Sequence, residues 1–295
     1  MLKMGETGQA PIQTYRGNCH CTAFIFEIDL PRIQTVTECN CSICFQKGYL
    51  WVPSSRKDLK VEKGDMKSLS SYTFGPEKLA HKFCSTCASI VMAEETAGDA
   101  LYLNVRVLQD LDIWALKRQQ HDGAAEGGDY APPEYEGKVP TAAKGQQLYT
   151  GSCHCGGFGL ALMSKTLDDT YSSRIAECTC SVCVRNAYIW IYPQAKQVVL
   201  SAAESGNIGR YSFSHHVLNK TFCTICGVCM TNEYAHRSKE ELKYLGAVPT
   251  RGFAQSMKNS HPLNLRVLND IDRDKLPKPM RNNGARKISP RYKNP

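Results

Sequence analysis

The sequence lacks any long apolar run. No stretch of its 295 residues approaches the roughly 18 consecutive apolar residues of a membrane-spanning helix. Its first residues, MLKMGETGQAPIQ, also lack the apolar core of a secretory signal. These absences argue against a membrane partner, and we expect a cytoplasmic protein, with the nucleus as the alternative location.

Charge is scarce outside the C-terminal end. The formal net charge is +8, yet seven basic residues and no acidic ones lie between positions 275 and 295, so the remainder of the chain is nearly neutral. A basic tail with Pro and Asn is typical of a solvated chain end. A nucleic-acid partner is therefore disfavoured. If the protein binds one, the basic tail is the segment that would do so. The seven residues are Lys275, Lys278, Arg281, Arg286, Lys287, Arg291 and Lys293.

Long amphipathic helices are also lacking. The segments TAFIFEIDL, AYIWIYP, KQVVLSA and ALYLNVRVL are short, rich in β-branched and aromatic residues, and bounded by Gly, Pro, Asn or Ser. They predict strands and a mainly β fold. A short helical turn is expected after Asp110 and Asp270, which could cap it.

The chain repeats itself. YRGNCHC, ECNCSICFQKGYLW, KFCSTCA and LNVRVLQDLD return as YTGSCHC, ECTCSVCVRNAYIW, TFCTICG and LNLRVLNDID. The second copy is longer by about 20 residues near ELKYLGAVPTRGFAQSMKNSH. We predict a first domain at 13–114, a linker rich in Gly, Ala and Pro at 115–146, a second domain at 147–274 and the basic tail at 275–295.

Cysteine is abundant, with fifteen residues. In a reducing compartment such abundance indicates metal binding more often than disulfides, and an odd number repeated twice argues against a disulfide framework. Each repeat holds seven, and Cys229, which is left over, is interpreted as a small buried residue. The two sets are Cys19, Cys21, Cys39, Cys41, Cys44, Cys84 and Cys87, then Cys153, Cys155, Cys178, Cys180, Cys183, Cys223 and Cys226.

Seven cysteines divide into four and three. The CHC and FCxxC pairs each bring two thiolates and together complete a tetrahedral zinc site, whereas CxCxxC would hold a zinc ion with one open position. His20 and His154, between paired cysteines on a strand, point to the opposite face and are interpreted as packing residues rather than ligands. Glu38 and Glu177 precede the CxCxxC runs and are interpreted as solvated carboxylates rather than proton shuttles.

In these motifs, GxCHC, CxCSxC, FCxxC and NVRVL or NLRVL, the sequence resembles the glutathione-dependent formaldehyde-activating enzymes and their relatives, which include centromere protein V. The resemblance implies two tandem Mss4-like zinc-binding β domains, each with a structural and a catalytic zinc ion. It implies structural ligands Cys19, Cys21, Cys84 and Cys87, then Cys153, Cys155, Cys223 and Cys226. It implies catalytic ligands Cys39, Cys41 and Cys44, then Cys178, Cys180 and Cys183.

The implied activity is that of a zinc-dependent carbon–sulfur lyase, S-(hydroxymethyl)glutathione synthase-like, acting on a thiol adduct or small carbonyl compound with glutathione as a candidate co-substrate. The alternative is a non-catalytic zinc module that binds protein or nucleic acid, as in the centromere protein V branch. Thr22 and Ala88 stand where the family prefers glycine. Phe45-Gln46 and Val184-Arg185 differ after the third cysteine, which predicts two metal sites of one kind but one working active site.

Overall fold

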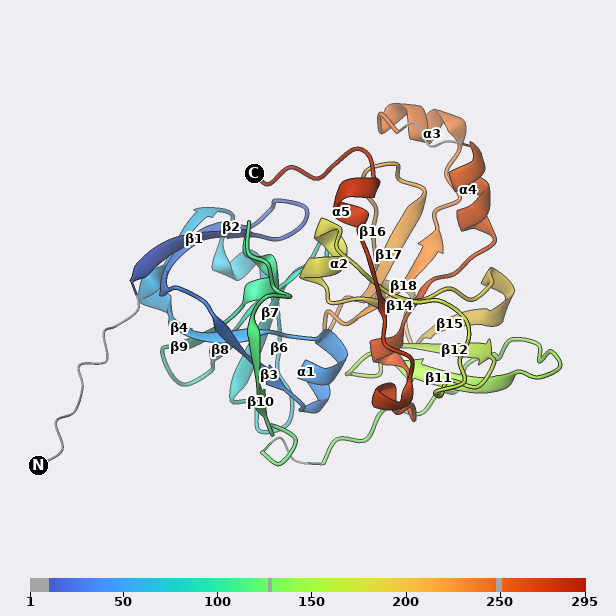
Figure 1. Ribbon diagram of the computed structural model, residues 1–295, viewed down its shortest axis with the longest axis horizontal. Coiled ribbons are helices and arrows are strands. Elements are labelled where there is room, and N and C mark those ends of the chain that lie inside the picture. Colours follow the sequence, from blue (N-terminus) through green and yellow to red (C-terminus); the bar gives the residue numbers. More distant parts are fainter. Residues whose placement is uncertain (1–10, 127–128, 248–250) are drawn as a thin grey trace, which may run out of the picture.

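The protein consists of two β-rich halves that lie side by side, as this computed structural model of residues 11–126, 129–247 and 251–295 shows (Figure 1). Each half contains one three-stranded and one seven-stranded sheet with the same strand order, β1-β2-β5 matching β11-β12-β15 and β10-β3-β4-β9-β8-β7-β6 matching β20-β13-β14-β19-β18-β17-β16. The predicted mainly β class with two tandem domains is therefore confirmed.

The first half contains ten strands among the described residues. They are β1 (Ile12–Asn18), β2 (Ile25–Pro31), β3 (Thr35–Cys39), β4 (Trp51–Ser55), β5 (Leu59–Lys63), β6 (Leu69–Tyr72), β7 (Leu79–Cys84), β8 (Ile90–Glu95), β9 (Ala100–Asn104) and β10 (Lys117–His121). The helix α1 (Ser42–Lys47) and the short 3₁₀ turns η1 (Arg56–Asp58), η2 (Met66–Ser68) and η3 (Val105–Val107) join them.

The second half repeats these elements and adds to them. Its strands are β11 (Gln147–Ser152), β12 (Phe158–Ser164), β13 (Ile175–Cys178), β14 (Ile189–Ile191), β15 (Val198–Ala202), β16 (Ile208–Tyr211), β17 (Leu218–Cys223), β18 (Cys229–Tyr234), β19 (Leu263–Asn264) and β20 (Met280–Asn282). Its helices are α2 (Ser181–Arg185), α3 (Lys239–Tyr244), α4 (Arg251–Lys258) and α5 (Gly284–Lys287), with 3₁₀ turns η4 (Ala195–Gln197), η5 (Ser205–Asn207), η6 (Leu265–Val267) and η7 (Arg273–Lys275). Helices α3 and α4 lie in the segment where the second copy is longer.

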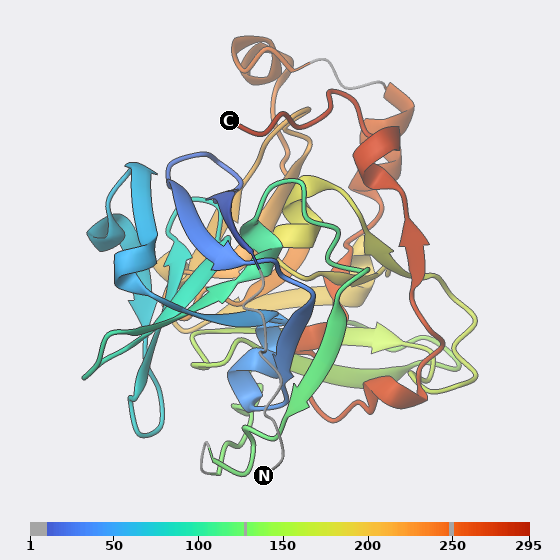
Figure 2. The ribbon, with the colours of Figure 1, turned by 60° about the vertical axis from the view of Figure 1, so that its left-hand side comes forward.

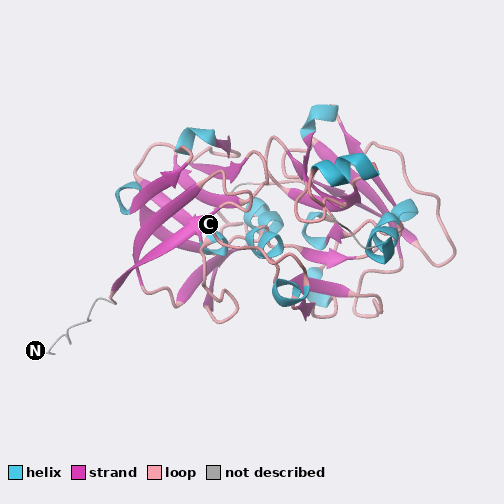
Figure 3. Cartoon of the chain, turned by 90° about the horizontal axis from the view of Figure 1, so that it is seen from above, coloured by secondary structure: helices cyan, strands magenta, loops and turns pink. Residues whose placement is uncertain are grey.

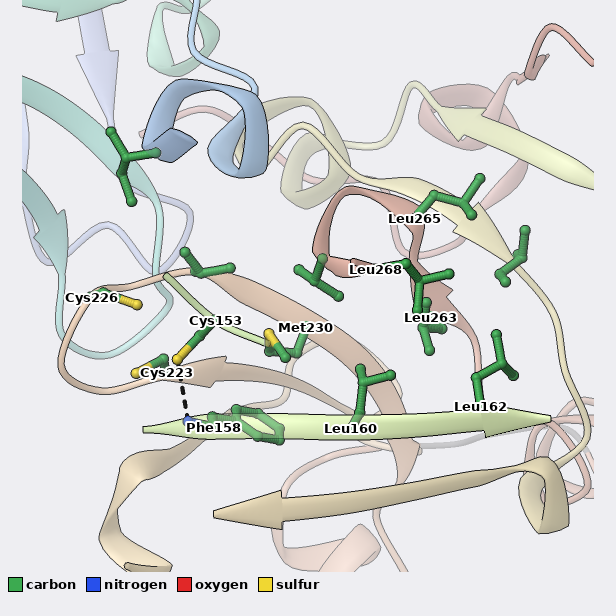
Figure 4. Packing of buried hydrophobic residues seen from close by; sticks show 14 of the residues in the cluster. Cys153, Phe158, Leu160, Leu162, Cys223, Cys226, Met230, Leu263, Leu265 and Leu268 are labelled. Atoms are coloured by element: carbon green, nitrogen blue, oxygen red, sulfur yellow. Dashed lines mark hydrogen bonds between the residues drawn. The ribbon is translucent and has the colours of Figure 1, made fainter. Parts of the chain in front are cut away.

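The strands form because apolar residues alternate along them. In β2, Phe26, Ile28 and Leu30 are buried, while Glu27 and Asp29 between them are not. The matching β12 is buried along nearly its whole length, so it lies deeper in the molecule. Figure 4 shows the resulting core, in which Phe158, Leu160 and Leu162 of β12 face Met230 and the leucines near β19.

The segments predicted as linker and basic tail both add a strand to the fold. Within 115–146, β10 pairs in parallel with β3, as Figure 2 shows for the green and blue strands. Within 275–295, β20 pairs in parallel with β13 in the same way. Each repeat therefore ends in an arm, which we define as residues 117–126 and 129–130 in the first repeat and 280–292 in the second. These strands have no apolar periodicity, because a short strand at the edge of a sheet buries little side-chain surface.

Short helical turns are predicted after Asp110 and Asp270. The motif LNVRVL itself contains the 3₁₀ turn η3, which Asn104 caps through a bond from the Arg106 N–H. Asp110 and Asp270 instead adopt left-handed backbone angles, with φ of 56° and 54°. A 3₁₀ turn, η7, does follow Asp270, but its cap is Asp272, which accepts a bond from the Asp274 N–H. In the first repeat Asp112 likewise accepts from the Trp114 N–H. The expectation that Asp110 and Asp270 are the caps was wrong, because the capping aspartate lies two residues further along the chain.

None of the helices in the described part of the chain has the length and apolar character that a membrane-spanning segment needs.

The two halves pack through α1 and α2, which lie between them (Figures 1 and 3). Arg266 donates from Nε to the Ala187 carbonyl and from Nη1 to the Phe45 carbonyl of the opposite repeat, at 2.7 and 3.1 Å. Arg106, its counterpart, bonds Gly48 and the opposite Val184 in the same pattern. The arginine of each VRVL or LRVL motif thus joins both helices.

A shared core reinforces this contact. Tyr49, Trp51 and Ile90 of the first repeat belong to the same buried cluster as the core of the second repeat. Gly227 lies so close to the opposite repeat that an added Cβ atom would be 2.6 Å from the Phe83 ring. The repeats therefore form one packed body.

We predict that Gly227→Ala lowers the free energy of unfolding by about 2 kcal/mol, because the methyl group collides with Phe83 and the residue has a φ of +70°. Urea unfolding at saturating zinc measures the change. Gly206→Ala is the control, since nothing lies within 4 Å of its Cβ position, and it should stay within about 0.5 kcal/mol of the wild type. Equal effects of the two substitutions would contradict the close contact.

Candidate metal centres

Each repeat gathers four cysteines from two turns. Cys19 and Cys21 follow β1, Cys84 ends β7 and Cys87 follows it, and their sulfurs lie within 4.8 Å of one another. Cys153, Cys155, Cys223 and Cys226 repeat this arrangement after β11 and β17. The Sγ atoms of Cys19 and Cys21 are 3.6 Å apart, close to the roughly 3.8 Å expected for a tetrahedral zinc site with Zn–S bonds of about 2.3 Å. The four donors therefore fit a zinc ion.

The remaining three cysteines of each motif set form a second cluster. Cys39 ends β3, Cys41 is the N-cap of α1 and Cys44 lies within it, and their sulfurs also lie within 4.8 Å of one another. Cys178, Cys180 and Cys183 take the same places around α2. None of the fifteen cysteines forms a disulfide. The predicted division into four and three is thus the grouping that the fold brings together.

Hydrogen bonds to sulfur hold the three-cysteine clusters. The indole N–H of Trp51 donates to the Cys44 sulfur at 3.4 Å, and Trp190 donates to Cys183 at 3.3 Å. The thiol of Cys41, followed by that of Cys44, lowers the pKa of Cys39 to about 2. The Cys39 sulfur in turn raises the pKa values of Cys41 and Cys44. The cluster therefore stabilises one thiolate, which is the form of cysteine that binds a metal.

The turns that carry the four-cysteine clusters need left-handed backbone. Thr22 and Ala88 have φ of 62° and 55°, and their counterparts Gly156 and Gly227 have φ of 79° and 70°. This explains the glycine preference noted from sequence, because glycine adopts such angles without the steric cost of a Cβ atom. The first repeat carries that strain at both positions.

The histidines between the paired cysteines bind the opposite repeat. His20 contacts the Tyr211 hydroxyl through Nδ1 at 2.8 Å and the Ser181 hydroxyl through Nε2 at 2.9 Å. His154 contacts Tyr72 and Ser42 at the same two distances. Neither ring belongs to a cysteine cluster. Each four-cysteine turn is therefore linked to the serine inside the other repeat's CxCSxC run.

Burial keeps these two imidazoles neutral. Both histidines are only 3% exposed. Burial lowers the pKa of His20 to about 3 and that of His154 to about 4. A neutral ring has one donor and one acceptor nitrogen, which two hydroxyl groups can satisfy together.

The residues that follow the third cysteine also face the opposite repeat. Lys47 is 2% exposed. Burial raises the pKa of Cys226, but the three partner thiols and then the charge of Lys47 across the interface lower it. Arg185 donates to the carbonyl of Asn18 at 2.9 Å, beside the four-cysteine turn of the first repeat. Each helix thus brings one buried cation to the other repeat's four-thiolate cluster. The sequence difference at these positions is a difference in the interface.

The two arms cross the three-cysteine clusters. A Cβ atom on Gly123 would lie 2.4 Å from the Cys39 sulfur, and one on Gly284 would lie 2.3 Å from the Cys178 sulfur. Asn40 bonds Asp122 and the Ala124 N–H at 2.8 Å each. Thr179 makes the matching contacts with Asn283 and Ala285.

Each arm then reaches the opposite four-cysteine turn. The Tyr130 ring stacks on His154 with centroids 4.2 Å apart, and its hydroxyl donates to the His154 carbonyl at 2.9 Å. Tyr292 stacks on His20 at 4.6 Å and donates to the His20 carbonyl at 3.0 Å. Sequence reasoning missed both arms. The matching HDGA and NNGA segments, each followed by a tyrosine, are the signal that could have found them.

The second three-cysteine cluster opens into a cavity of about 990 Å³. Its walls include all three cysteines of the cluster together with Trp190, Phe213 and Lys220.

The carboxylate before the first three-cysteine cluster is held by the neighbouring strand. Glu38 accepts a bond from Gln120 and lies 3.9 Å from Arg118, both on β10. That carboxylate therefore contacts its own arm.

Part of the chain matches a known protein family. Residues 14–121 match the model of the family described as glutathione-dependent formaldehyde-activating enzyme. The first repeat is a domain of that family. The matched range ends at the last residue of β10, so the family domain includes the strand of the first arm. The second repeat has the same strand order and the same two cysteine clusters.

One solved structure is also similar to the chain. It is a crystal structure of a Rhodobacter sphaeroides protein with 26% sequence identity, and the match covers 35% of this chain and 99% of that chain with a TM-score of 0.32.

We predict that Thr22→Gly raises the free energy of unfolding by about 0.5–1 kcal/mol, because glycine adopts the left-handed angle without the Cβ penalty. The reciprocal Gly156→Thr should lower it by about 1–2 kcal/mol. Chemical denaturation at saturating zinc measures both.

The neighbouring Ala23→Gly serves as the control for Thr22→Gly. Ala23 is exposed and does not have a positive φ, so glycine there should only destabilise the fold. If Thr22→Gly destabilised the protein as much as Ala23→Gly, the strain at position 22 would be disproved.

Proposed function

We propose that this protein is a zinc-dependent carbon–sulfur lyase that joins a thiol to a small carbonyl compound, or splits the adduct, at a three-cysteine site. The observation that carries this proposal is the pairing of a complete four-cysteine cluster with a separate three-cysteine cluster in each repeat. Structural zinc sites use four protein ligands, whereas catalytic ones keep a position for substrate.

The donor set supports the proposed chemistry. A zinc ion held by three thiolates can accept a substrate sulfur as thiolate or polarise a carbonyl oxygen. The indole N–H of Trp190 orients Cys183 and withdraws charge from its sulfur. The cavity beside the second cluster gives a substrate room, and its aromatic walls would limit water around the reacting atoms.

Glutathione and formaldehyde are the first substrates to test, because the family description names both and the first repeat matches it. Cationic side chains on the cavity wall, Arg174, Arg291 and Lys293, suit a thiol that carries carboxylates. The carbonyl partner must be small, since the arm passes directly over Cys178.

We predict that the protein accelerates exchange between ¹³C-formaldehyde and its glutathione adduct, measured by NMR exchange spectroscopy. The double variant Cys41→Ser/Cys180→Ser should lose at least about 100-fold of this acceleration, because both three-thiolate sites lose a ligand. Zinc analysis should show that the four-cysteine sites remain loaded, with two fewer zinc ions per chain than in the wild type.

Cys229→Ala is the matched control, since Cys229 is buried but belongs to neither kind of cluster. It should keep the exchange rate and the full zinc content. A wild-type protein that carries zinc but does not accelerate exchange of glutathione or other small thiols would refute the proposed activity.

A further inference from the structure

The two three-cysteine sites differ at one pair of facing strand positions. In the second repeat, Lys220 on β17 lies opposite Asn232 on β18. In the first repeat, the equivalent pair on β7 and β8 is His81 and Ala93. The cysteines and the tryptophan of the two sites are the same, so this pair changes the polar groups beside an otherwise similar cluster.

Lys220 is a buried cation placed beside the cluster. It is 7% exposed, and its Nζ lies 4.4 Å from the centre of the Trp190 ring, whose N–H donates to the Cys183 sulfur. Among the described residues it has no hydrogen bond or ion pair through Nζ. It lines the cavity that contains Cys178, Cys180 and Cys183, so its free N–H groups are available to a ligand there.

Asn232 adds a free acceptor to the same wall. This residue is also 7% exposed, and its Oδ1 atom is buried without a hydrogen-bond partner. A buried amide oxygen without a partner costs roughly 1–3 kcal/mol, which a ligand that donates to it would recover. The wall thus offers a donor and an acceptor side by side.

The first repeat offers neither. His81 is bound to the Tyr49 hydroxyl at 3.0 Å, and burial lowers the pKa of His81 to about 3, so it carries no charge. Ala93 has no polar side-chain atom. The first site therefore lacks both a charged donor and a free acceptor at this place.

We propose that Lys220 and Asn232 bind the oxygen atom of the carbonyl compound or its thiol adduct, and that the second three-cysteine site is consequently the one that handles this substrate. The inference rests on the proposed lyase function and assigns its oxygen-binding residues. The hydroxyl of an S-(hydroxyalkyl) adduct accepts a bond from Lys220 and donates one to Asn232.

The pair also fits the course of the addition. A substrate thiol loses its proton to solvent and its sulfur lone pair forms the C–S bond, while the C=O π electrons move to oxygen. The Lys220 ammonium gives a proton to that oxygen and regains one from water. In the reverse direction the hydroxyl proton leaves, the C=O bond forms again and the C–S electrons return to sulfur.

Thiol binding tests the pair without requiring turnover. In cobalt-loaded Cys41→Ser protein, only the second three-cysteine site can take an external thiol, and its visible spectrum reports binding. We expect 2-mercaptoethanol, whose hydroxyl resembles that of the adduct, to bind about tenfold more tightly than ethanethiol. Lys220→Met and Asn232→Ala should each remove this preference, whereas Asn219→Ala should keep it, because Asn219 bonds Glu233 instead.

The first site provides the reciprocal test. Cobalt-loaded Cys180→Ser protein keeps His81 and Ala93 and should bind the two thiols equally. An equal affinity in the Cys41→Ser protein, or a preference that survives both Lys220→Met and Asn232→Ala, would overturn the inference. Asn232→Ala installs the alanine of the first repeat, so it gives a result even where Lys220→Met disturbs folding.

Exchange kinetics separate this inference from the proposed activity. Suppose that the Cys41→Ser protein accelerates formaldehyde exchange and that adding Lys220→Met to it does not slow the exchange at least tenfold. The proposed lyase activity is then supported, and the oxygen-binding role of Lys220 is refuted. If no exchange occurs but the hydroxyl preference is present and depends on Lys220, the lyase fails and the oxygen-binding site stands.

Discussion

The packing of each four-cysteine turn against the opposite repeat is the contact on which the rest of the structure depends. His20 and His154 cross the interface to the serines of the opposite three-cysteine runs, and both rings are buried and neutral. Four thiolates around a zinc ion carry a charge of about −2, which is costly to bury without a compensating cation. Lys47 and Arg185 supply that cation from the opposite side in each case. The charge of each cluster therefore ties the two repeats into one unit.

This arrangement links the structural and the reactive clusters. Ser42 and Ser181 begin α1 and α2, the helices that also carry Cys44 and Cys183. A change in a four-cysteine turn would reach the opposite three-cysteine cluster through the histidine and the serine. The arms add a second connection, because each passes over its own three-cysteine cluster before its tyrosine stacks on the opposite histidine.

Much of the fold and of the cysteine grouping could be predicted from the sequence. Runs rich in β-branched and aromatic residues and the spacing of cysteines are local signals, so strands such as β2 and β15 and the four-plus-three division follow from them. The arms could not be read in this way, since β10 and β20 are exposed edge strands with polar sequences. The interface between the repeats could not be predicted either. The sequence around Phe45 and Lys47 does not indicate whether these residues contact their own repeat or the opposite one.

The symmetry of the interface explains how the two sites could diverge. In a twofold contact, each residue meets its partner twice, as His20 with Ser181 and His154 with Ser42 do here. Two identical chains would have to change both copies together. When the two copies are joined in one chain, each can change independently. The buried cation beside the opposite four-cysteine cluster is Lys47 on one side and Arg185 on the other. The same freedom allows Lys220 and Asn232 to stand beside one three-cysteine cluster while His81 and Ala93 stand beside the other, so the shared framework is kept and only one site gains free polar groups.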